Sequence, residues 1–60
     1  LTAREQEVIR LACTGASNKE IAHMIGVRAP TVRVLFWRAC RKVGAGNRDE
    51  LIERFKSTSV

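Results

Sequence analysis

Apolar residues recur at helical spacing in four segments of the chain, and each segment begins with its own start signal. In the first segment, Thr2 precedes Glu5 by three positions, which is the pattern of a capping box. Apolar residues with helical spacing follow as far as Gly15, which favours the left-handed conformation that ends helices. The segment predicts a helix over about 3–14 whose apolar residues are Val8, Ile9, Leu11 and Ala12.

The second segment repeats this arrangement over a shorter length. Ser17 and Glu20 form another capping box, and Gly26 follows the last apolar position. We expect a helix over 18–25. Its buried stripe should consist of Ile21, Met24 and Ile25.

The third segment is the longest. Pro30 is tolerated only within the first turn of a helix, where its missing N–H would have no partner, so this helix should begin near Ala29. Gly44 and Gly46 end it, which predicts a helix over 29–43. With about 100° between successive residues, its core stripe should consist of Val32, Leu35, Phe36, Ala39, Cys40 and Val43.

The fourth segment opens with Asn47, which precedes Glu50 by three positions and is a good N-cap residue. It predicts a helix over 48–56, followed by a flexible tail over 57–60. No alternating strand pattern competes with these helices. We therefore expect an all-α domain of four helices over 1–56.

Three residues have the spacing of a helix-turn-helix, at relative positions 0, +4 and +10: Ala22, Gly26 and Val32. A small residue at the first position lets two helices approach, the glycine makes the turn, and the valine packs the third helix onto the core. The outward face of that helix combines cations with a large aromatic side chain. In a major groove, arginine can donate two hydrogen bonds to guanine, and Val or Trp can contact thymine methyl groups. The outward residues are Pro30, Arg33, Val34, Trp37 and Arg41.

The charge distribution favours a polyanionic partner. The 60 residues carry 11 Lys and Arg against 6 Asp and Glu, which gives a net charge of +5. Residues 28–48 contain 6 cations and no acid, whereas residues 1–27 sum to zero and residues 49–60 to −1. Such a block is the electrostatic footprint of a protein that neutralises phosphates. A solvated basic face, or binding to an anionic membrane or an acidic partner, would give the same count.

Composition excludes several other classes. No run of about 20 apolar residues is present, so we expect no membrane span. No nucleophile–base pair or metal-ligand spacing is present, and His23, the only histidine, falls on the outer side of the second helix. We expect no enzyme, no cofactor and no metal. Cys13 and Cys40 lie within apolar helical patterns, which indicates reduced core residues of a cytoplasmic protein, with a disulfide between them as the alternative.

Four short motifs stand in order along the chain. They are LTxRExEV at 1–8, G-x-SNKEIA at 15–22, TVR at 31–33 and NRDEL at 47–51. Together they resemble the LuxR-type (GerE-type) helix-turn-helix domain of bacterial transcriptional regulators, over about residues 1–55. This resemblance implies four helices, a third helix that recognises duplex DNA, and a fourth that often forms a dimer interface.

The resemblance also implies roles for individual residues. Base contacts of the family match Arg33, Val34 and Trp37, to which we add Pro30 from the same face. We expect phosphate contacts from helix N-termini and nearby cations: Ser17, Asn18, Lys19, Thr31, Arg41, Lys42 and Arg48. A homodimer, formed at least on DNA, should draw its interface from Leu51, Ile52 and Phe55, of which at least one should instead lie in the core.

Further partners follow from the same resemblance. Members of the family commonly carry a regulatory domain before this one. Because the chain opens on Leu1 without an initiator Met, we expect the domain to be excised from a longer regulator. RNA polymerase is a further expected partner.

Two other interpretations stay open. The stretch 32–42 also resembles the last helix-turn-helix of bacterial sigma factors, although that group lacks the SNKEIA and NRDEL pieces. A diverged helix-turn-helix could instead bind a protein through Phe36 and Trp37, or Trp37 could pack against the fourth helix or a neighbouring subunit. Salt separates these cases, because DNA binding weakens steeply between about 50 and 200 mM salt and a hydrophobic contact does not.

Overall fold

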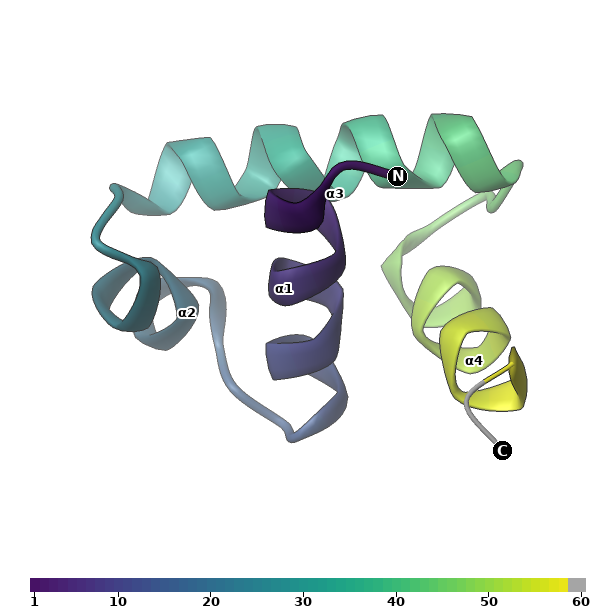
Figure 1. The fold of residues 1–60 in the computed structure, drawn as a ribbon, viewed down its shortest axis with the longest axis horizontal. Coiled ribbons are helices and arrows are strands. Elements are labelled where there is room, and N and C mark those ends of the chain that lie inside the picture. The colour runs from purple at the N-terminus through teal and green to yellow at the C-terminus, as the bar shows by residue number, and fades with distance from the viewer. Residues whose placement is uncertain (59–60) are drawn as a thin grey trace.

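The computed structural model describes residues 1–58, which form four α-helices and no strand. The helices are α1 (Ala3–Cys13), α2 (Asn18–Ile25), α3 (Ala29–Val43) and α4 (Arg48–Thr58). Figure 1 shows α3 along one side of the molecule, α1 crossing beneath its middle, and α2 and α4 beneath its two ends. The predicted all-α architecture of four helices is confirmed.

Two capping boxes determine where α1 and α2 begin. In each, a hydroxyl accepts the backbone N–H of a glutamate at 3.2 Å, and the glutamate carboxylate accepts the backbone N–H of the hydroxyl residue at 2.9 Å. The pairs are Thr2–Glu5 and Ser17–Glu20, as predicted. These bonds satisfy N–H groups that every helix leaves unpaired at its start. The prediction is therefore accurate here, except that α1 ends at Cys13 rather than at residue 14.

Helix α4 begins as predicted but ends later. The backbone N–H of Glu50 donates to Oδ1 of Asn47 at 2.8 Å, while the Glu50 carboxylate accepts the N–H of Gly46 at 2.8 Å. The hydroxyl of Ser57 donates to the carbonyl of Glu53, one turn earlier, at 3.0 Å. Helix α4 includes Ser57 and Thr58, which were predicted to belong to a tail. Residues 59–60, the rest of the predicted tail, lie outside the described residues.

The turn between α2 and α3 has the geometry that its spacing predicts. Ala22 is buried at the contact between the two helices, and its carbonyl accepts the N–H of Val27 at 2.9 Å. Gly26 has φ = 73°, a left-handed conformation that a side chain would strain. Val32 is completely buried and fixes α3 against the core. The helix-turn-helix prediction is confirmed.

The core lies beneath the inner face of α3. The predicted stripe is confirmed, because Val32, Phe36 and Ala39 are buried and the other three residues are half-buried. The prediction for Met24 is wrong, since its side chain is 59% exposed. Helix α2 packs its inner face on α1 and α3, and Ile21 and Ala22 are the buried residues of that face.

Two further expectations concern the cysteines and the membrane. Cys13 and Cys40 are half-buried free thiols, so the alternative of a disulfide between them is wrong. Within residues 1–58, no helix combines the length and the apolar character needed to cross a membrane.

Candidate nucleic-acid interface

The outer face of α3 points away from α1, and none of the other three described helices covers it (Figure 1). The residues predicted for this face are all exposed, including Val34 at 45% and Trp37 at 59%. The alternative in which Trp37 packs against the fourth helix is therefore wrong. Phe36 is only 6% exposed, so it is not available to a protein partner either. The remaining outer residues are Pro30, Arg33 and Arg41.

The indole of Trp37 is stacked with a cation on its own helix. The guanidinium carbon of Arg41, one turn later, lies 5.0 Å from the centroid of the indole ring. This distance is within the range of cation–π attraction. The stacking covers one side of an exposed aromatic ring and holds the charge of Arg41 on the same face.

Residues 28–48 form the basic stretch of the chain, and four of its cations have no acidic partner among the described residues. Arg28, Arg33, Arg38 and Arg41 form none of the ion pairs that the structure contains. All four are exposed. Their positive charge is therefore available to an external anion.

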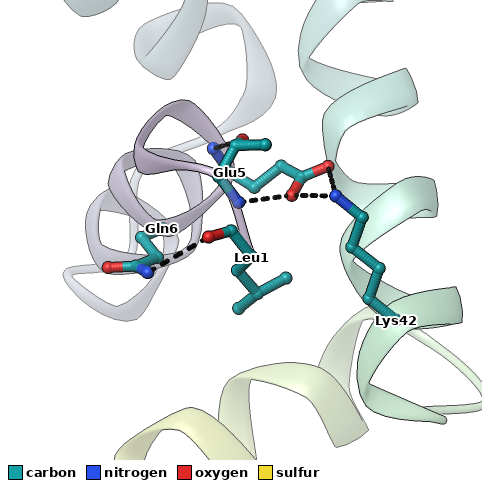
Figure 2. Close-up of polar contacts among 5 residues, drawn as sticks. Leu1, Glu5, Gln6 and Lys42 are labelled. Carbon is teal, nitrogen blue, oxygen red and sulfur yellow. Dashed lines mark hydrogen bonds and ion pairs between the residues drawn. The ribbon is translucent and has the colours of Figure 1, made fainter.

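Lys42 differs from these four cations. Its ammonium group donates to both carboxylate oxygens of Glu5, at 2.9 and 3.2 Å, which joins α3 to the start of α1 (Figure 2). Glu5 is 2% exposed. The hydrogen bond from Lys42 and that from the backbone of Thr2 lower the pKa of Glu5 from 4.5 to about 2, although burial opposes them. Glu5 thus offsets part of the charge of Lys42, whose phosphate contact stays a prediction.

Arg48 also has partners inside the molecule. Its guanidinium donates to Oδ1 of Asn18 and, at 3.3 Å, to the carbonyl of Ala16. The guanidinium carbon lies 4.4 Å from the centroid of the Phe36 ring. Arg48 is half-buried. These contacts link α4 to α2 and α3, and phosphate binding by Arg48 stays a prediction.

The first turn of α2 presents the remaining polar candidates. The hydroxyl oxygen of Ser17 accepts a hydrogen bond from the backbone N–H of Glu20, which leaves the hydroxyl hydrogen free to donate. Lys19 is exposed and forms no ion pair with a described residue. Thr31 is likewise exposed, in the first turn of α3. These side chains remain predicted phosphate contacts.

The predicted dimer residues do not share one environment. Leu51 is completely buried in the core, so its assignment to a dimer interface is wrong. Ile52 and Phe55 are half-buried, and their role stays a prediction. A helical pattern shows which residues share a face but not which helix covers that face, and this explains the error.

The sequence interpretation missed two long-range contacts. Glu5 and Lys42 are 37 residues apart, and Asn18 and Arg48 are 30 apart. The capping role of Glu5 was visible because it is local. The ion pair of Glu5 with Lys42 could not be predicted locally, because it depends on how α1 and α3 cross. No group of three or more His, Cys, Asp or Glu that could hold a metal ion occurs among residues 1–58.

Comparison with known proteins identifies relatives of the whole domain. Residues 1–55 match the model of the GerE family, whose description is bacterial regulatory proteins, luxR family. No solved structure gave a significant match.

Three curated relatives match most of this chain. The transcriptional activator protein VanR of Vibrio anguillarum is 43% identical over 54 residues, which cover 90% of this chain and 22% of VanR. The tetrathionate response regulatory protein TtrR of Salmonella typhimurium is 39% identical over 56 residues, covering 93% of this chain and 27% of TtrR. The transcriptional regulatory protein DesR of Bacillus subtilis is also 39% identical over 56 residues, covering 93% and 28%. The chain thus spans about a quarter of the length of these relatives.

Proposed function

This chain belongs to the luxR family of bacterial regulatory proteins, and from that premise we propose that it binds double-stranded DNA sequence-specifically and regulates transcription. The family consists of regulators rather than enzymes. The observation that carries the proposal is the outer face of α3, where cations and an exposed indole lie together and no other helix within residues 1–58 covers them.

Base recognition would come from the exposed residues of α3 in the major groove. Arg33 would donate two hydrogen bonds to O6 and N7 of a guanine, which is the commonest specific contact of an arginine. Val34 and Trp37 would contact thymine methyl groups or sugars. Pro30, in the first turn, would contribute an apolar contact at the entry to the groove.

Phosphate contacts would fix the position of α3 on the duplex. Ser17 and Lys19 are at the start of α2, where the helix dipole and free N–H groups attract an anion. Thr31 and Arg41 would contact the backbone on either side of the base-contacting residues. These contacts carry affinity and no sequence information.

The assembly would be a homodimer, at least on DNA. A domain of this size covers a short site, and two copies related by a two-fold axis would read two half-sites. Ile52 and Phe55, half-buried on α4, would form the contact between subunits. We further propose a cytoplasmic regulator in which a regulatory domain precedes this one and RNA polymerase is a partner, since this chain covers only 22% of the transcriptional activator protein VanR and 27% of the tetrathionate response regulatory protein TtrR.

Selection of bound duplexes from a random pool tests the proposal most directly. We expect an enriched motif that occurs as two half-sites and contains a guanine read by Arg33. The binding constant should fall steeply as salt rises from about 50 to about 200 mM. No enrichment, together with amide shifts that stay constant at Arg33, Val34 and Trp37 when DNA is added at low salt, would refute the proposal.

A further inference from the structure

Arg48 lies at a junction of three elements. From the first position of α4 it reaches Asn18 in the first turn of α2, Ala16 in the loop before α2, and the ring of Phe36 on α3. A guanidinium is planar and carries several donors in fixed directions, so contacts on two edges and one face hold it in one orientation. This side chain therefore behaves as part of the framework.

The contact also orients the side-chain amide of Asn18. A guanidinium has donors and no acceptor, so the amide atom that faces it must be the oxygen. The NH2 group then points to the other side of the amide plane. Among residues 1–58 this amide nitrogen has no hydrogen-bond partner, although Asn18 is half-buried.

The orientation matters because of where Asn18 is. It is the first residue of α2, between the capping Ser17 and the exposed Lys19, at the positive end of the helix dipole. Without Arg48 the amide could turn its oxygen outwards, and an outward oxygen would repel a phosphate. With Arg48 in place only the donor side is available.

We infer, on the basis of the proposed DNA binding, that Arg48 is a positioning residue that turns the Asn18 amide into a phosphate donor and does not itself contact DNA. The geometry separates this role from direct binding. Two edges of the guanidinium are bonded to Asn18 and Ala16, and one face lies on Phe36. The signal in the sequence was a basic residue near a helix start. Its tertiary partners give it an indirect role.

A double-mutant cycle tests the inference. The variants are Arg48→Met, Asn18→Ala and the two combined, titrated with a short mixed-sequence duplex, because phosphate contacts do not depend on sequence. Each single variant should bind about tenfold more weakly, as expected for the loss of one hydrogen bond to a charged group. The double variant should also lose about tenfold, and not about a hundredfold, because both changes remove the same bond.

Lys19→Ala is the matched control, because Lys19 neighbours Asn18 and does not touch Arg48. In the combined variant, the fold-loss of affinity from Lys19→Ala should multiply with that from Arg48→Met. If Arg48 only kept the start of α2 in place, the effect of Arg48→Met on binding would be equally non-additive with Asn18→Ala and with Lys19→Ala. In addition, the slope of log affinity against log salt should be the same for Arg48→Met and the parent, whereas loss of a direct phosphate contact would reduce it by about 0.9.

NMR spectroscopy tests whether the Asn18 amide contacts DNA even if Arg48→Met is not folded. The side-chain NH2 resonances of Asn18 in the parent should shift when the duplex is added. Constant resonances, or independent effects of Arg48→Met and Asn18→Ala, would overturn the inference while leaving DNA binding intact. If the parent itself does not bind the duplex at low salt, the proposed function fails and the inference fails with it.

Discussion

Phe36 and Trp37 are adjacent aromatic residues that lie on opposite faces of α3. Phe36 is 6% exposed and belongs to the core, whereas Trp37 is 59% exposed and has the guanidinium of Arg41 across its ring. A rotation of about 100° per residue is enough to separate them. The helix therefore stabilises the domain with one face and offers the other to a ligand.

The cations of the basic stretch divide in the same way. Lys42 and Arg48 are bound to Glu5 and Asn18, while Arg33 and Arg41 have no acidic partner among the described residues. Charge in a stretch of sequence is therefore not equivalent to charge available to DNA.

Loss of the buried aromatic ring should have the largest effect on stability. Phe36→Ala should lower the free energy of unfolding by about 3–5 kcal/mol, because it leaves a cavity beneath α3. Trp37→Ala is the matched control and should change it by no more than about 0.5 kcal/mol. Urea unfolding followed by circular dichroism measures both, and Phe36→Leu serves if the alanine variant does not fold. Equal losses for the two residues would contradict the division of α3 into two faces.

Acid should lower the stability of the domain, because it protonates Glu5 and removes its ion pair with Lys42. The pKa of Glu5 in the folded protein is lowered from 4.5 to about 2, so its contribution to stability is fully present above pH 4.5 and is lost as the pH falls towards 2. Urea unfolding at a series of pH values should show this loss for the parent. Glu5→Gln should be less stable at neutral pH and should vary less with pH. Some variation should remain, because the pKa values of Glu20 and Glu50 are also lowered by hydrogen bonds. Parallel curves for parent and variant would show that Glu5 is not the group responsible.

On the outer face, Arg33→Ala should affect DNA binding and not folding. We expect a loss of about 1–3 kcal/mol of binding free energy on the selected site and relaxed preference at one base pair. Competition between the selected duplex and single-base variants measures both quantities. The stability of the domain should stay within about 0.5 kcal/mol of the parent. If the variant distinguished every base as well as the parent does, the base contact would have to come from another residue.

Lys19→Ala and Lys42→Ala form the most sensitive comparison between a free and a paired cation. Removing Lys19 should weaken binding to all sequences alike and reduce the slope of log affinity against log salt by about 0.9. Removing Lys42 should leave that slope unchanged and should instead lower stability, because Glu5 loses its ion-pair partner. Binding isotherms at several salt concentrations, combined with urea unfolding, measure the two effects. A reduced slope for Lys42→Ala would show that Lys42 contacts phosphate in spite of its ion pair with Glu5.

The sequence by itself determined the features that depend on local interactions. The starts of α1 and α2 follow from hydroxyl and carboxylate groups three residues apart, and the turn follows from Gly26. The outer face of α3 also followed, because side-chain direction on a helix repeats with a known period. Most of the candidate interface was therefore predicted correctly as exposed.

Tertiary structure decided which of these side chains have partners. Whether Leu51 is buried, Met24 exposed, Lys42 paired or Arg48 bound to Asn18 depends on how helices far apart in sequence cross. Helical period assigns a residue to a face but carries no information about what covers that face. The reason is that packing and ion pairing depend on distances in space, which the chain sets only when all four helices share one core.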